Sequence, residues 1–279
     1  MLKQKNISPV AARTVTPEGV RAYTDALSVE EPLEIRIAHS AGAGRRRLSV
    51  AVTMRTPGDD EDLALGFLFT EGLIRDGNQV MGIKWLEENT LLVELNPAVA
   101  VDTERLTRHL FTSSSCGVCG KASLDAVQTV ACFFSVPGYP VVSPPVLYGL
   151  PDTLRQAQAT FEVTGGLHAA GLFDTGGTLL LLREDIGRHN AVDKVIGGAL
   201  RQGRSFPLRD DVLMVSGRAG FELVQKAAMA GLPFLAAVGA PSSLATELAA
   251  DAGMTLVGFL RGKQFNVYSH PERIGQANQ

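Results

Sequence analysis

The chain has 279 residues, of which 45% are hydrophobic and 20% charged, enough for a full core and two packed lobes. Its net charge of −3 argues against the basic field that holds nucleic acid. No run approaches the roughly 18 apolar residues of a membrane span, and the first residues lack the apolar core of a secretory signal. We therefore expect a cytoplasmic globular protein that binds neither nucleic acid nor membrane.

Residues 1–111 are expected to form a β-rich N-terminal lobe, flexible over roughly the first 15 residues. Alternating apolar and polar side chains predict half-buried strands at 31–37, 47–54, 83–86 and 91–95. Turn and N-cap chemistry at 57–60 precedes Leu63, Phe67 and Leu68 at core spacing and predicts one helix. A short second helix is expected at 103–111.

Residues 112–150 are interpreted as a connector that carries a mobile loop. Prolines are dense at 137–145, which disfavours a regular element there, and one helix is possible after Lys121. Long connections in compact domains are often functional. This one holds two of the three cysteines.

Residues 151–279 are expected to form an α/β lobe. The predicted strands are 167–173, 178–183, 212–215, 234–238 and 255–260, and the predicted helices are 151–162, 219–230, 243–252 and one from Ile186 to about Leu200. Strands alternating with helices imply right-handed crossovers and a largely parallel sheet. The fold class is therefore α/β in this lobe and α+β overall.

Three predicted strands end in segments suited to an anionic ligand, because ligands bind beyond the carboxyl ends of parallel strands. These segments are 216–218, 239–243 and 261–264, which contain glycine, serine, Arg218, Arg261 and Lys263. Small residues let a ligand approach the backbone, and arginine or lysine complements an anion. A nucleotide or another phosphate-bearing group would fit there.

The stretch TSSSCGVCGK places Cys116 and Cys119 two residues apart, and three kinds of chemistry use such a pair. Structural zinc needs four ligands, and besides this pair the chain offers only Cys132 and scattered histidines such as His109. A thioredoxin-type dithiol needs a strand that leads into the pair, and none is predicted. Sulfur carriage needs a mobile thiolate that takes a sulfur from a donor persulfide, while the second thiol helps release it. Cys132 is interpreted as a buried small hydrophobe.

Six segments together resemble the formate dehydrogenase accessory sulfurtransferases, the FdhD family. They are TSSSCGVCGK, MRTPGDDEDLALGFLFTEG, EDIGRHNAVDK, SGRAGFELVQKAAMAGLPFL, APSSLA and GFLRGKQFNVYS. The resemblance implies a sulfur carrier that takes sulfur from a cysteine desulfurase. It implies delivery to the molybdenum cofactor, in its bis-guanine-dinucleotide form, before that cofactor serves the catalytic subunit of formate dehydrogenase. It also implies a homodimer and no permanently bound metal.

Carried over to matching positions, the resemblance makes Cys116 the persulfide-bearing cysteine and Cys119 its partner. It assigns the cofactor, and a guanine nucleotide at the same site, to the residues Phe259, Leu260, Arg261, Gly262, Lys263 and Gln264. The C-terminal lobe is expected to be similar in fold to cytidine deaminases.

Two rival functions are weighed against sulfur carriage. A zinc deaminase needs HxE at one helix start and PCxxC at the next, but neither His168 nor His189 is followed by such a glutamate, and the cysteines are missing. His189 and Asn190 are expected at a helix entrance beside the strand ends, where they could hydrogen-bond the cofactor, and for His189 a structural role is equally compatible with the sequence. The second rival is a non-catalytic chaperone that only binds the molybdenum cofactor for formate dehydrogenase.

Overall fold

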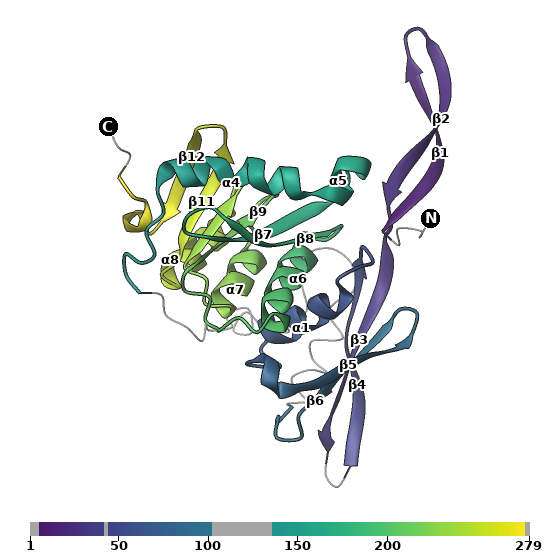
Figure 1. Ribbon diagram of the computed structural model, residues 1–279, viewed down its shortest axis with the longest axis vertical. Helices are drawn as coiled ribbons and strands as arrows, with labels where there is room; N and C mark the ends of the chain where they lie inside the picture. The colour runs from purple at the N-terminus through teal and green to yellow at the C-terminus, as the bar shows by residue number, and fades with distance from the viewer. Residues whose placement is uncertain (1–5, 42–43, 102–135, 277–279) are drawn as a thin grey trace.

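The computed structural model describes residues 6–41, 44–101 and 136–276. Within them a long hairpin, a four-stranded sheet and a six-stranded sheet follow one another, with helices around the larger sheet (Figure 1). The mixed α/β class predicted from the sequence is confirmed. Among the described residues, none of the helices combines the length and the apolar character needed to cross a lipid bilayer.

The chain begins with a hairpin of β1 (Ile7–Thr16) and β2 (Gly19–Ser28), which form a sheet of their own. The prediction of a flexible lead-in is therefore wrong for residues 7–15. Threonine and valine on both sides of the two-residue loop 17–18 favour paired strands, and Thr16 pairs with Gly19 across that loop. The sequence favoured a flexible segment because many of its residues are small or polar.

The N-terminal sheet contains β3 (Glu31–Ala41), β4 (Gly44–Arg55), β5 (Val80–Glu87) and β6 (Thr90–Leu95), in the order β4-β3-β6-β5. All four were predicted. The predicted helix is α1 (Asp60–Thr70), and the short η1 (Gly77–Gln79) precedes β5. The expected N-cap chemistry is absent at Asp59, which has a φ of 53° and no capping bond from its side chain.

The C-terminal lobe contains five helices and six strands within the described residues. The helices are α4 (Pro144–Ala157), α5 (Ala159–Thr164), α6 (Arg188–Arg201), α7 (Phe221–Met229) and α8 (Ser243–Asp251), and a short η2 (Pro271–Arg273) follows the last strand. The strands are β7 (His168–Asp174), β8 (Leu179–Asp185), β9 (Asp211–Val215), β10 (Phe234–Ala237), β11 (Thr255–Arg261) and β12 (Gln264–Ser269).

Three sequence-based expectations for this lobe need correction. Helix α4 starts at Pro144 instead of Pro151, because proline is well tolerated in the first turn of a helix, where its missing N–H has no partner anyway. The sheet is mixed rather than largely parallel: in the order β12-β11-β10-β9-β7-β8, only β9, β10 and β11 run parallel. Strand β12 was missed because its turn was interpreted as a ligand-binding loop.

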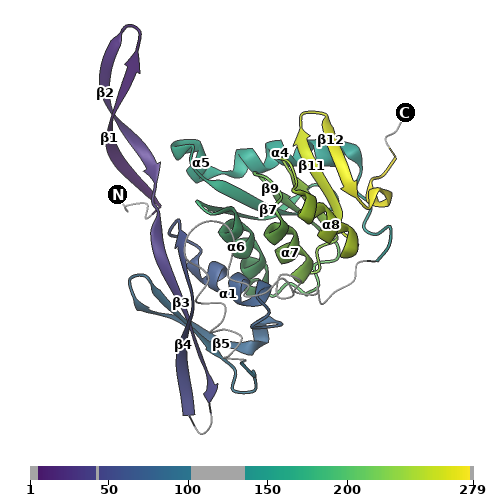
Figure 2. The same ribbon diagram turned by 180° about the vertical axis from the view of Figure 1, so that it is seen from behind.

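The six-stranded sheet is covered on both faces (Figures 1 and 2). Alternate residues of the central strands face opposite sides, so Met214 packs in the cluster that contains α4 and Leu213 in the cluster that contains α6 and α7. The second cluster continues into α1 and the N-terminal sheet. The two lobes therefore share one core.

Helices α1 and α6 make the contact that joins the lobes. A Cβ placed on Gly66 would lie 1.8 Å from the carbonyl oxygen of Asp193, and one on Gly197 would lie 1.8 Å from the carbonyl oxygen of Asp62. No side chain larger than hydrogen fits at either position. The glycines of the DLALGFLFTEG and VIGGAL stretches thus allow the two helix backbones to touch.

Candidate functional site

The carboxyl ends of the three parallel strands meet at one edge of the large sheet, as the sequence predicted. The Gly239 N–H donates to the Gly217 carbonyl at 2.9 Å, and the Phe259 N–H donates to the Gly239 carbonyl at 3.1 Å. The Ala219 N–H donates to the Ala240 carbonyl at 3.2 Å. A Cβ on Gly239 would lie 3.0 Å from the Arg218 side chain, so small residues are needed for this convergence.

The predicted cofactor segment 259–264 occupies the third of these strand ends. Leu260 is fully buried in the sheet core, whereas Arg261 and Gln264 pair across the exposed turn between β11 and β12. Phe259 has a φ of 52° and interrupts the regular ladder, and the Arg261 guanidinium carbon lies 5.9 Å from the centre of its ring. The segment therefore offers Arg261, Lys263 and the Phe259 ring to a ligand, whereas Leu260 packs in the core.

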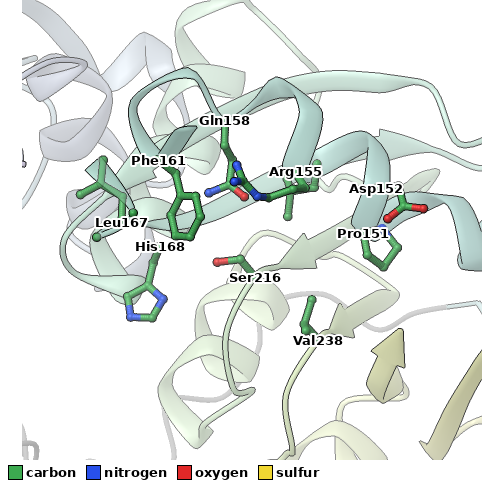
Figure 3. Close-up of a pocket in the computed structure, with 12 residues that line it drawn as sticks. Pro151, Asp152, Arg155, Gln158, Phe161, Leu167, His168, Ser216 and Val238 are labelled. Carbon is green, nitrogen blue, oxygen red and sulfur yellow. The ribbon is translucent and has the colours of Figure 1, made fainter. Parts of the chain in front are cut away.

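A pocket of about 550 Å³ opens beside the other two strand ends (Figure 3). This volume is typical of small-molecule sites. One wall is formed by α4, α5 and the residues that follow them. The other is formed by the start of β7 and the ends of β9 and β10. The pocket is lined by Pro151, Asp152, Leu154, Arg155, Gln158, Phe161, Gly165, Gly166, Leu167, His168, Ser216 and Val238. Nothing in the sequence pattern indicated the contribution of α4 and α5.

One buried polar group in this pocket lacks a partner among the residues that the structure describes. Gln158 is only 3% exposed, and its Nε2 has no hydrogen-bond partner among the residues that the structure describes. Such an orphan is costly to bury unless a ligand or water accepts its proton. The Ser216 hydroxyl oxygen accepts the Ala169 N–H at 2.9 Å, which leaves its own proton for another acceptor. The pocket is thus rich in donors.

An aromatic ring and a cation lie on the α4–α5 side. The Arg155 guanidinium carbon is 4.4 Å from the centre of the Phe161 ring, and the same arginine forms an ion pair with Glu162 at 3.0 Å. A planar ring system stacks well on such a phenylalanine. This wall suits a flat heterocycle.

Positive charge gathers on the opposite side, where α6 and α7 begin. Burial, followed by the charges of Arg188 and His189, lowers the pKa of His168, so a neutral imidazole faces the pocket near pH 7. A Cβ on Gly220, the N-cap residue of α7, would lie 3.9 Å from Arg188 Nη2. Neither Arg188 nor Arg218 forms an ion pair within the described part of the chain. Uncapped helix starts beside arginines attract anions.

The EDIGRHNAVDK stretch is largely structural. The buried Lys194 Nζ lies 2.7 Å from Asp185 Oδ2, and the Asn190 amide donates to Asp185 Oδ1 at 2.9 Å and to the Met54 carbonyl at 2.8 Å. His189 Nε2 lies 2.7 Å from Glu222 Oε2. Asn190, for which the sequence suggested contact with a cofactor, thus has a structural role. Asp193, which contacts Lys226 at 2.9 Å, has a pKa raised by burial.

Several predicted residues lie outside the described residues. They are Cys116, Cys119, Cys132, His109 and Lys121, together with the expected helices at 103–111 and after Lys121. Within the described ranges, no group of three or more histidine, cysteine or acidic side chains is arranged to hold a metal ion.

Comparison with known proteins places this architecture in a family. A profile described as the FdhD/NarQ family matches residues 28–275. This chain belongs to that family. A sulfur carrier protein FdhD from Nocardia farcinica is 52% identical over 270 residues, which cover 93% of this chain and 92% of the relative. The corresponding protein of Saccharolobus solfataricus is 43% identical over 255 residues, 91% of this chain and 93% of the relative.

A solved structure has the same fold as this FdhD/NarQ chain. It is described as a putative formate dehydrogenase accessory protein from Desulfotalea psychrophila. The TM-score is 0.74 at 24% sequence identity, with 96% of this chain and 99% of the other covered. The expected likeness to cytidine deaminases stays a prediction.

Proposed function

We propose that this chain is a sulfur carrier in the maturation of formate dehydrogenase. Its family and the printed name of its relatives, sulfur carrier protein FdhD, support the role. In this proposal Cys116 accepts sulfur from a cysteine desulfurase and passes it to the bis-guanine-dinucleotide form of the molybdenum cofactor. The observation that favours a bound cofactor is the donor-rich pocket around the unpartnered Gln158 amide.

The proposed transfer passes the sulfur through two thiol exchange steps that balance in bonds and electrons. The Cys116 thiolate attacks the outer sulfur of the donor's persulfide, an S–S bond forms, and the donor cysteine leaves as a thiolate. Cys119 then attacks the Cys116 sulfur, which closes a disulfide and releases the carried sulfur as sulfide for the molybdenum of the client. A dithiol reductant restores both thiols. The carrier is a sulfurtransferase in this sense, because the sulfur passes through a covalent intermediate on the protein.

The pocket suits the nucleotide part of such a client. We assign the heterocycle to the wall of Phe161 and Gln158, where the ring stacks and the Gln158 amide donates to a carbonyl or ring nitrogen. We assign phosphate to Arg188 and Arg218, beside the starts of α6 and α7. The turn of Arg261 and Lys263 lies at the same sheet edge.

Intact-protein mass spectrometry tests the carrier role. The chain is incubated with a cysteine desulfurase and cysteine, and the native protein is compared with Cys116→Ala and Cys119→Ala. We expect a reducible gain of one sulfur atom that disappears in Cys116→Ala. Absence of that gain in the native protein, with GDP binding intact, would instead support the non-catalytic chaperone.

Binding of GDP, measured by calorimetry, tests the pocket separately. The double variant Arg188→Ala/Arg218→Ala should weaken GDP binding by about a hundredfold, since hydrogen bonds to charged groups are worth about 1.5–3 kcal/mol each. Arg75→Ala is the matched control on the N-terminal lobe. Equal GDP affinity in the double variant and the native chain would remove the phosphate assignment without touching sulfur transfer.

A further inference from the structure

The two edge strands of the six-stranded sheet, β8 and β12, lie in different surroundings. Strand β8 is held by neighbouring elements, since the Glu184 carboxylate accepts the Thr160 N–H of α5 at 2.9 Å. The Asp185 carboxylate accepts the Thr56 N–H, just before α1, at 3.2 Å. Strand β12 forms the opposite margin of the sheet, on the side away from the N-terminal sheet (Figures 1 and 2). An edge strand offers a row of backbone groups to any extended segment that reaches it.

The backbone of β11 fixes which groups turn toward β12. The Thr255 N–H donates to the Pro233 carbonyl, on the side of β10, at 2.8 Å. The next N–H, of Leu256, donates instead to Ser269 Oγ at 3.1 Å, on the side of β12. Because consecutive residues of a strand turn their backbone groups to opposite sides, those of Gly258 also face β12.

The outer side of β12 follows from that alternation. Asn266 pairs with Gly258, so its backbone groups face β11. Phe265 and Val267, on either side of it, then point their N–H and C=O groups outward. No residue that the structure describes accepts a hydrogen bond from these two N–H groups. Both residues are therefore open to pairing with a further strand.

The open stretch is short and unprotected. Residues 264–268 read QFNVY and contain no proline and no charged side chain, which are two usual protections of an edge. The ladder shifts register between Val267 and Ser269, which leaves Tyr268 as an extra residue and ends the regular edge. Such a short edge suits one extended segment of a partner better than the pairing of two whole sheets.

Unpaired cations lie at the start of this stretch. Arg261 and Lys263 are exposed, and neither forms an ion pair within the part of the chain that the structure describes. Residues 261–269 contain no aspartate or glutamate. Two copies of this edge would therefore bring no carboxylate to these cations, whereas an acidic segment of another protein would complement them.

Apolar side chains reach the same edge on the face that α4 covers. Phe265 and Val267 pack against the core cluster of that face, and the centre of the Tyr148 ring of α4 lies 5.6 Å from that of Phe265. Alternate side chains of an added strand would fall on this face, where apolar ones would cover the Phe265 ring. The edge thus fits a segment that carries both acidic and apolar residues.

We propose that β12 binds an extended segment of the client dehydrogenase, with acidic residues beside Arg261 and Lys263 and apolar residues beside Phe265. The segment adds a seventh strand to the six-stranded sheet. This assignment rests on the proposed function, because the client is the formate dehydrogenase named there. The predicted cofactor segment 259–264 leads directly into β12, so a client strand on this edge lies next to that segment.

Biolayer interferometry with the catalytic subunit of formate dehydrogenase, on the immobilised full chain, tests the backbone pairing. Val267→Pro removes one outward N–H without touching the ladder to β11 and should weaken client binding about tenfold or more. Val267→Thr keeps the N–H and the branched shape, and as the matched control it should stay within about threefold of the native chain. GDP affinity and melting temperature, measured for both variants, report whether the fold is intact.

A charge variant tests the same edge without a change in the backbone. Lys263→Glu should weaken client binding about fivefold and reduce its dependence on salt, because a like charge then faces the acidic segment. Arg46→Glu makes the same change at an exposed position of β4 and should leave client binding unaltered.

Three results would overturn the proposal. They are a catalytic subunit that does not bind the native chain, equal binding by Val267→Pro and Val267→Thr, and equal binding by Lys263→Glu and Arg46→Glu. Sulfur loading of Cys116 requires neither the client nor β12. Mass spectrometry of the loaded chain therefore shows separately whether the carrier role holds when client docking at this edge fails.

Discussion

The two sides of the start of α6 use polar residues in opposite ways. On the side that faces α1 and β4, Asp185, Asn190 and Lys194 have all found partners inside the protein. On the side of His168, whose pKa the Arg188 charge helps to lower, Arg188 has no ion pair within the described residues, and in the pocket that His168 lines the Gln158 Nε2 has no acceptor among those residues. Satisfied polar groups hold a fold together, while unsatisfied ones are available to a ligand.

The largest effect is expected where α1 and α6 touch. Gly66→Ala should prevent stable folding or cost several kcal/mol, because its Cβ would overlap the Asp193 carbonyl and a close-packed core cannot open locally. Thermal unfolding followed by circular dichroism measures this. Gly149→Ala in α4 meets nothing within 4 Å and should keep or slightly raise the stability. Equal melting temperatures for the two variants would show that the helices do not make this contact.

The second-largest effect is expected for the buried ion pair between Lys194 and Asp185, on the side of α6 that faces α1 and β4. Lys194→Met leaves the fully buried Asp185 without its cation and should lower the free energy of unfolding by about 3–5 kcal/mol. Urea denaturation provides the measurement. Lys84→Met breaks the more exposed pair with Glu94 and should cost about 0–1 kcal/mol. A loss of similar size in both variants would contradict the structural role assigned to the EDIGRHNAVDK stretch.

Much of the fold could be predicted from the sequence. The strands at 31–37 and 91–95 and the helix after Ile186 were found because periodicity is local, and the three strand ends converge as the alternation of strands and helices implied. The pocket wall of α4 and α5 was missed because it depends on which helix covers which face of the sheet. That is a tertiary choice, and the prolines at the start of α4 concealed only the part of the helix before Pro151.

Gln158→Leu tests whether the unpartnered amide in the pocket is available to a ligand. Removal of a buried donor without an acceptor should raise the stability of the ligand-free chain by about 1 kcal/mol, while GDP binding weakens about tenfold through the lost hydrogen bond. Thermal unfolding with and without GDP separates the two effects. Gln156→Leu, at an exposed position of the neighbouring helix α4, should change neither. If Gln158→Leu lowers stability and leaves GDP affinity intact, the amide belongs to the structure and not to a ligand.

The smallest effect is a pH dependence at His168. Burial, with the charges of Arg188 and His189, lowers the pKa of this imidazole below its ordinary value of about 6.5. Between the two pKa values, His168 is protonated in the unfolded chain and neutral in the folded chain. The free energy of unfolding therefore decreases as the pH falls from about 6.5 toward the lower folded pKa. His168→Gln should flatten that part of the curve of unfolding free energy against pH. A bound anion should raise the pKa again, so GDP affinity should increase on acidification in the native chain more than in His168→Gln. Parallel pH profiles for the two proteins would mean that His168 meets neither the arginines nor the ligand, and the cationic side of the pocket would then rest on Arg188 and Arg218 alone.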